Sequence, residues 1–277
     1  MKQYLKLVNF EFNRFFKLYL VLIGITILTQ IIGVITTARM HVNRANRANE
    51  WINEEHMTKG DIQLAPISFY DFSQSAWFMG PIALGAATLL IYVFFIWYRD
   101  WLGKNTFSYR LFMLPIARIQ VYLAKAATIL LYVLGLIALQ LLLMPVENKI
   151  LKWIVPSEFR TDLSINEITR IPNVALLIPN TLGEFVLYYA AGVGVVSIVF
   201  TAILFERSYR VKGIMYGILF CAASQLVFFA PLLVNTFVLK NYFYPTELFF
   251  MELATGLVVA ACSIWTANFL IKNKVRV

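Results

Sequence analysis

Charged residues are scarce in this 277-residue chain: they make up 14% of it, whereas hydrophobic residues make up 60%. An ordinary soluble domain carries about 25% charged residues, so this sequence cannot cover a large core with a polar surface. A mean hydropathy of +0.71 also excludes intrinsic disorder, because so much apolar surface collapses or enters lipid. The composition therefore indicates an integral membrane protein.

Cysteine and histidine are almost missing. The two cysteines, Cys221 and Cys262, exclude a disulfide-stapled secreted domain, and both lie in apolar runs where a thiol behaves as a small hydrophobic group. The two histidines, His41 and His56, lack the i, i+4 spacing of a metalloprotease helix. The phosphate-binding pattern G-x-x-x-x-G-K-S/T does not occur either. We therefore expect no enzyme activity, no metal site and no bound cofactor in this chain.

The sequence does contain several long apolar runs. Each is about 20 residues long, which is enough for a helix to cross about 30 Å of hydrocarbon. The first run has no small-residue cleavage site after it, so we expect it to be retained in the protein. The predicted fold class is all-α, a polytopic membrane protein with one transmembrane domain over residues 1–277. Its six predicted spans cover residues 18–38, 76–98, 122–144, 182–205, 213–234 and 248–271.

The distribution of charge predicts the orientation of these spans. Lys and Arg strongly outnumber Asp and Glu in the N-terminal segment, the loops 99–121 and 206–212, and the C-terminal tail. The two long loops, 39–75 and 145–181, are close to neutral together. The positive-inside rule then places both termini in the cytoplasm. The net charge of +9 is explained by topology and by contact with anionic lipids, and we expect no nucleic-acid partner.

The long outward loops mix charges with aromatic residues and prolines. Helical spacing over 44–55 and 149–155 favours short interfacial helices, with solvated linkers as the alternative.

The N-terminal segment has the pattern of an amphipathic helix in the inner membrane interface. Its apolar stripe consists of Tyr4, Leu5, Leu7, Val8, Phe12, Phe15 and Phe16. Glu11 and Arg14 are three residues apart and are expected to pair on its surface. The helix is either a topology anchor or a lever that docks against a cytoplasmic partner.

The loop after the second span contains a second helical pattern, from Asn105 to Leu114. Phe107, Leu111 and Leu114 share one face, and Pro115 bounds the segment. A short helix that presents aromatic and basic side chains to the cytosol either packs on another protein or lies on lipid. Periodicity alone leaves both interpretations open.

A family resemblance begins where this loop ends. The run Leu114-Pro115-Ile116-Ala117-Arg118, followed by Leu123-Ala124-Lys125, resembles the Leu-Pro-Ile-Ser/Ala-Arg and Gly-Lys signature of ABC transporter permeases of the second export type. The resemblance implies that residues 105–114 form a coupling helix on a separate ATPase subunit. The implied ATPase-coupling residues are Asn105, Thr106, Phe107, Tyr109, Arg110, Leu111, Leu114, Pro115 and Arg118, with Glu11 and Arg14 on the interfacial lever.

The same resemblance implies partners and a function. The chain would be the permease domain of an exporter in a bacterial cell membrane, with ATP and Mg²⁺ bound by the partner ATPase. Six spans are half of the usual twelve in this family, so a second permease chain, identical or related, is expected. The expected cargo is amphipathic or hydrophobic: a peptide, drug or lipid-linked molecule. The alternatives are a stand-alone secondary transporter and a non-transporting sensor or immunity protein on the same scaffold.

Several polar positions in the apolar runs are further candidates. The resemblance makes Gln30 and Gln225 candidates for the transport pathway, and Glu252 is the best candidate for a buried functional carboxylate. Lys125 and Glu184 lie near span ends and are expected to reach the membrane interface. Prolines and polar residues interrupt residues 228–247, where the family has a re-entrant helical pair on the outer side. Gly213 and Gly217 form a G-x-x-x-G pair, a spacing that allows close helix packing.

Overall fold

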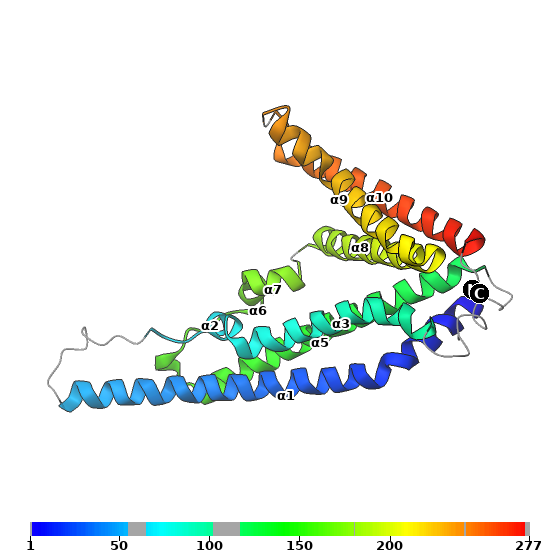
Figure 1. Ribbon diagram of the computed structural model, residues 1–277. Coiled ribbons are helices and arrows are strands. Elements are labelled where there is room, and N and C mark those ends of the chain that lie inside the picture. The colour runs from blue at the N-terminus through cyan, green and yellow to red at the C-terminus, as the bar shows by residue number, and fades with distance from the viewer. Residues whose placement is uncertain (1, 55–64, 102–116, 180, 241, 275–277) are drawn as a thin grey trace. The chain divides into compact units, whose positions relative to one another are not determined.

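The computed structural model describes the chain except for residues 1, 55–64, 102–116, 180, 241 and 275–277 (Figure 1). The described residues contain helices and no strand beyond one isolated bridge. Six helices are long and apolar enough to cross a membrane, which supports the prediction of a multi-pass membrane protein. They are α1 (Lys2–Glu54), α3 (Ala76–Trp101), α5 (Ile119–Ile154), α8 (Leu182–Tyr209), α9 (Val211–Phe237) and α10 (Pro245–Asn273). The short helices are α2 (Phe69–Ser73), η1 (Ser157–Phe159), α6 (Ile165–Thr169) and α7 (Pro172–Leu177).

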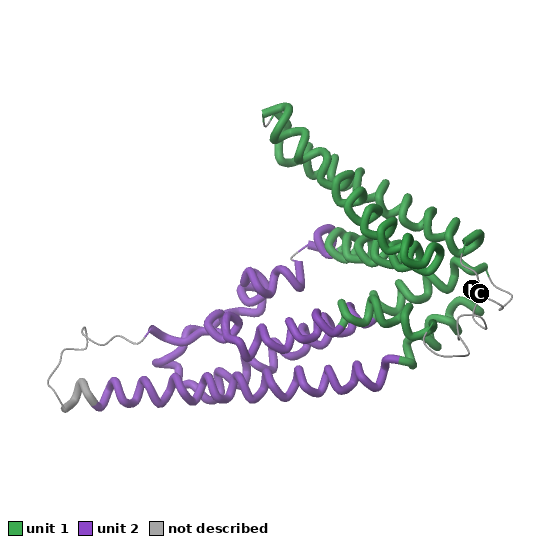
Figure 2. Tube along the Cα trace, viewed as in Figure 1, with its two compact units in different colours: residues 1–14, 89–131, 186–277 green, residues 15–88, 132–185 purple. Residues whose placement is uncertain are grey.

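The chain divides into two compact units (Figure 2). Unit 1 contains residues 1–14, 89–131 and 186–277, and unit 2 contains residues 15–88 and 132–185. Four of the long helices, α1, α3, α5 and α8, contribute residues to both units. The single domain over 1–277 stays a prediction.

Unit 2 has a hydrophobic core to which long and short helices both contribute. Ala38 of α1, Leu151 of α5 and Ile168 of α6 are buried in this core. Three phenylalanine rings, those of Phe69, Phe72 and Phe78, pack edge to face with centroids 5.7–6.0 Å apart. Burial of such rings supplies much of the packing energy of a small core.

The helices predicted over 44–55 and 149–155 are not separate elements. The structure extends α1 to Glu54 and α5 to Ile154. The part of α1 in unit 2 is about 60 Å long at 1.5 Å per residue, roughly twice the thickness of a hydrocarbon core. No proline or glycine interrupts the chain between Gly33 and Glu54, so nothing ends the helix where the apolar run ends.

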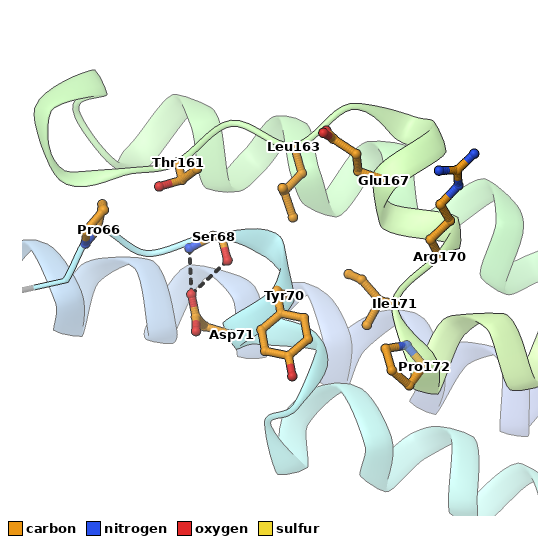
Figure 3. Close-up of a pocket in the computed structure, with 10 residues that line it drawn as sticks. All are labelled: Pro66, Ser68, Tyr70, Asp71, Thr161, Leu163, Glu167, Arg170, Ile171 and Pro172. Atoms are coloured by element: carbon orange, nitrogen blue, oxygen red, sulfur yellow. Dashed lines mark hydrogen bonds between the residues drawn. The ribbon is translucent and has the colours of Figure 1, made fainter.

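The described parts of the long connections of unit 2, on either side of Ile67 and Thr161, pack together. The Ile67 amide donates to the Phe159 carbonyl at 3.0 Å, and the Thr161 amide donates to the Ile67 carbonyl at 2.9 Å. Capping boxes begin α2 at Ser68 and α6 at Ser164. A groove of about 510 Å³ lies between the two connections (Figure 3). Its lining consists of Pro66, Ser68, Tyr70, Asp71, Thr161, Leu163, Glu167, Arg170, Ile171 and Pro172.

In unit 1, part of the amphipathic N-terminal stripe packs against protein, whereas Leu5 of the same stripe is exposed. Leu7 is buried with Val121 and Ala124 of α5, and Tyr4 and Val8 pack on the same cluster. The predicted interfacial helix is the first part of α1, continuous with the first span, and is not a separate element. The physical reason is again the lack of a helix breaker between the two predicted segments.

The remaining helices of unit 1 pack closely on one another. A Cβ added at Gly213 would lie 2.1 Å from the Phe205 carbonyl oxygen, and one at Gly217 would lie 2.9 Å from the Ala202 carbonyl oxygen. The G-x-x-x-G pair therefore lets α9 approach α8 within this chain. Thr201 of α8 donates a hydrogen bond to the Ser263 carbonyl of α10 at 3.0 Å.

The connection between α9 and α10 is short, and the re-entrant pair that we expected there stays a prediction. Helix α9 continues through Pro231 to Phe237, and α10 begins at Pro245. The buried Asn235 side chain accepts a hydrogen bond from the Phe243 amide at 3.0 Å, which closes the turn. Among the described residues from 228 to 247, the chain thus forms two helices and a turn, without additional re-entrant helices.

Candidate functional site

The most unusual group of side chains in unit 1 is a set of five charged residues from three helices. Glu11 and Arg14 come from α1, Arg99 and Asp100 from the last turn of α3, and Lys125 from the start of α5. We call these five residues the ionic cluster. It contains two carboxylates and three cations.

Lys125 lies at the centre of the ionic cluster. Its Nζ donates to Glu11 Oε1 at 2.9 Å, to the Ile96 carbonyl oxygen at 2.9 Å, and to Asp100 Oδ2. The ammonium group also lies 5.2 Å from the centre of the Trp97 ring. The Lys125 and Glu11 side chains are 0% exposed, and that of Asp100 is 2% exposed. All three hydrogens of the ammonium group therefore have acceptors, as a buried cation requires.

Two arginines complete the ionic cluster at its more exposed side. Arg14 Nη1 donates to Asp100 Oδ1 at 2.6 Å, and Arg99 Nη2 donates to Glu11 Oε2 at 3.0 Å. Each carboxylate thus bridges Lys125 and one arginine. Removing ions from water costs several kcal/mol each, and only such mutual pairing offsets the cost.

The ionic cluster is located at both stems of the predicted coupling segment. Helix α3 ends at Trp101, one residue after Asp100, and α5 begins at Ile119, six residues before Lys125. In the sequence, the ionic cluster thus has members on both helices that flank the segment 102–116. Through Glu11 and Arg14, the same cluster also holds the first part of α1.

The predicted coupling residues Asn105, Thr106, Phe107, Tyr109, Arg110, Leu111, Leu114 and Pro115 lie outside the described residues. Arg118 is described, and its Nη1 donates to the Ile271 carbonyl oxygen of α10 at 3.2 Å.

The predicted pair of Glu11 and Arg14 is present, with 3.7 Å between Arg14 Nη1 and Glu11 Oε2, but it does not lie on the surface. Glu11 is fully buried, and Arg14 lies closer to Asp100 than to Glu11. Lys125 was expected to extend to the membrane interface, but it is buried, and two carboxylates and a carbonyl group satisfy it inside the protein. The sequence signal that could have indicated this cluster was the charge complementarity of Glu11, Asp100 and Lys125 at one end of three spans.

The candidate pathway residues are not brought together within either unit. Gln30 is buried in unit 2, where its amide donates to Gln140 Oε1 and to the Phe78 carbonyl oxygen, both at 3.2 Å. Gln225 of α9 and Glu252 of α10 belong to unit 1, and they are exposed and partly buried, respectively.

The carboxylate that is buried without a partner is Glu147 of α5, which we did not predict. Among the described residues, neither of its carboxylate oxygens has a hydrogen-bond partner, and the side chain is fully buried. Glu147 lies seven residues after Gln140 and four before Leu151, so all three share one face of α5. The helical spacing of these three residues was the signal in the sequence that Glu147 lies on the same face of α5 as Gln140 and Leu151.

Groups of side chains that could hold a metal ion are absent from the part of the chain that the structure describes. Comparison of the chain with family models, with curated protein sequences and with solved structures finds no match. A functional conclusion therefore has to come from the ionic cluster and from the sequence pattern beside it.

Proposed function

We propose that this protein is the membrane-spanning subunit of an ATP-driven exporter, with both termini in the cytoplasm of a bacterial cell. In this proposal, residues 105–114 form a coupling helix that binds a separate ATPase subunit, and Phe107 and Arg110 are the main contacts. The observation that supports it most directly is the ionic cluster at the two stems of this segment. A loop that only connects two spans needs no buried ion pairs at both of its ends.

The ionic cluster suits the transmission of force. Separation of Lys125 from Glu11 or Asp100 would leave an uncompensated charge in a buried environment, and this costs several kcal/mol. The ends of α1, α3 and α5 are therefore expected to move as one body when the coupling helix is pushed. The N-terminal part of α1 then acts as the predicted lever, through Glu11 and Arg14.

The proposed assembly follows from what the sequence lacks. Because the chain has no phosphate-binding loop, ATP and Mg²⁺ bind to the partner ATPase. A second permease chain completes the pathway, and lipids surround the spans. The proposed cargo is an amphipathic or hydrophobic molecule that moves outward.

Co-purification with the ATPase tests the proposal. The proposal expects an adjacent reading frame that encodes a phosphate-binding loop, and the probe is the product of that frame expressed with this chain. The double variant Phe107→Asp/Leu111→Asp should lose the ATPase and keep its membrane insertion, because two charges would enter an apolar contact. Tyr242→Asp is the matched control, since this exposed aromatic side chain lies far from the coupling segment in the sequence.

Two outcomes contradict the proposal. One is unchanged retention of the ATPase by the Phe107→Asp/Leu111→Asp variant. The other is labelling of Lys104→Cys by an impermeant maleimide added to the outside of intact cells, because the coupling segment must face the cytosol.

A further inference from the structure

The end of α3 carries a second set of contacts that the ionic cluster does not include. These contacts join Tyr98 and Trp101 of α3 to Glu206 and Arg207 in the last turn of α8, all within unit 1. We call these four residues the arginine–aromatic cluster. The charge pattern of the sequence predicts that the loop 206–212 lies on the inner side, and it indicates no role for these four residues.

The arginine–aromatic cluster combines a hydrogen bond with stacking. The Tyr98 hydroxyl donates to Glu206 Oε2. The Arg207 guanidinium carbon lies 4.9 Å from the centre of the Tyr98 ring and 5.0 Å from that of the Trp101 ring. A guanidinium group within about 6 Å of a ring centre is attracted to its π face, and here one cation contacts two rings.

The two clusters occupy opposite faces of the same helical turn. Successive residues of an α-helix are rotated by about 100°, so Tyr98 and Trp101 share one face while Arg99 and Asp100 lie on the other. Trp97 lies between the two sets: its ring stacks on Trp101 at 5.3 Å and also contacts the Lys125 ammonium group. The last turn of α3 is therefore held from one side by α1 and α5 and from the other side by α8.

Helix α8 connects this turn of α3 to the rest of unit 1. Its Phe200 ring packs against Trp97 at 5.4 Å and against Tyr122 at 5.5 Å. Thr201 donates to the Ser263 carbonyl of α10, and Gly217 of α9 approaches the backbone of α8 closely. A displacement of α8 thus has to be accommodated by α9 and α10.

We infer that Tyr98 and Arg207 are positioning residues that make α8 move together with the end of α3. The arginine–aromatic cluster gives the movement of the coupling segment a second route, through α8 to α9 and α10, beside the route through the ionic cluster. The joining of α3 to α8 is a property of this chain alone. Its use during ATP hydrolysis depends on the proposed function.

Distance measurements between spin labels test the joining of the two helices. The labels are placed at Ile91→Cys in α3 and Val195→Cys in α8, both exposed, after replacement of Cys221 and Cys262 by serine. The purified full chain in lipid vesicles should give one narrow distance distribution. Arg207→Gln, which removes the cation, should broaden it, and Arg207→Lys should partly restore it.

Two further variants distinguish the hydrogen bond of Tyr98 from the contacts of the Arg207 cation. Tyr98→Phe removes only the hydrogen bond to Glu206 and should broaden the distribution less than Arg207→Gln. Arg210→Gln is the matched control, because this exposed arginine lies three residues further along and should leave the distribution narrow. A distribution for Arg207→Gln as narrow as that of the unaltered chain would overturn the inference.

The role of the arginine–aromatic cluster during ATP hydrolysis is tested separately, by the kinetics of the bound ATPase. With the ATPase bound, Arg207→Gln should lower kcat for ATP hydrolysis and leave KM for ATP unchanged, because the nucleotide binds in the partner. A broadened distribution with unchanged kcat would overturn transmission through α8. Failure of the unaltered chain to retain any ATPase would instead reject the proposed function, while the distance distributions would still decide whether the cluster joins α3 to α8.

Discussion

Lys125 Nζ lies 2.9 Å from Glu11 Oε1, and this buried ion pair joins α5 to α1 across 114 positions of the chain. Both side chains are fully excluded from solvent. Water cannot replace either partner, so each charge depends on the other for its stabilisation. The pair therefore fixes the position of the N-terminal part of α1 relative to the stem of the coupling segment.

Replacement of this lysine should be among the most destabilising single changes in unit 1. Lys125→Met leaves Glu11 and Asp100 without their shared cation, and we expect a loss of about 3–5 kcal/mol in the free energy of unfolding. Thermal unfolding of the purified protein in detergent measures the effect. Lys125→Met combined with Glu11→Gln and Asp100→Asn is the comparison, because it also removes the two buried carboxylates that lose their shared cation. The two arginines, which then lose these carboxylates, are partly exposed to solvent. Equal stability of the single and triple variants would contradict the role assigned to the pair.

The close approach of α9 to α8 predicts a strong effect from a single methyl group. Gly213→Ala would place a Cβ 2.1 Å from the Phe205 carbonyl oxygen, and backbone atoms cannot move away cheaply. We expect a loss of about 1–3 kcal/mol, as for other overpacked sites. Gly192→Ala is the control, because no atom lies within 4 Å of its added Cβ. If both variants unfold at the same temperature, the packing of α9 on α8 is not as described.

Replacement of Glu147 should stabilise the protein, whereas the two replacements above should destabilise it. The Glu147 carboxylate is buried in unit 2 without a hydrogen-bond partner among the described residues, and such a group costs about 1–3 kcal/mol. Glu147→Leu should therefore raise the unfolding temperature. Gln140→Leu, seven residues earlier on the same helix, should lower it, because Gln140 accepts a hydrogen bond from Gln30. A destabilising effect of Glu147→Leu would indicate that the carboxylate has a partner.

The capping box of α6 predicts a pH dependence in unit 2. Hydrogen bonds from the backbone and hydroxyl groups of Ser164 hold the pKa of Glu167 below its ordinary value of 4.5. A lowered pKa means that the stabilisation is fully present above the ordinary value and is lost as the pH falls through the lowered one. Unfolding temperatures measured between neutral and acidic pH should show this loss. Glu167→Gln should lack this part of the pH dependence, and an unchanged profile in that variant would contradict the assignment.

Run lengths and charge were sufficient to predict the six spanning helices. A helix that crosses lipid must form its own backbone hydrogen bonds and present apolar side chains. Its presence can therefore be predicted from one short stretch of sequence. The helix ends were harder to predict. Residues 39–54 are polar, and the sequence predicted a separate short helix over 44–55, yet these residues continue α1, because no proline or glycine interrupts them. Pro231 likewise does not end α9, which continues to Phe237.

The sequence by itself predicted a membrane environment, an all-helical class and the position of the coupling segment. These predictions were possible because hydropathy and residue spacing can be read from about 20 neighbouring residues. Only the tertiary structure decided which charges meet. Glu11, Asp100 and Lys125 are far apart in the chain, and each alone is typical of a span end in contact with water. Their burial becomes favourable only when α1, α3 and α5 bring all of them together, since the energy of an ion pair depends on the distance between its partners and on the exclusion of solvent.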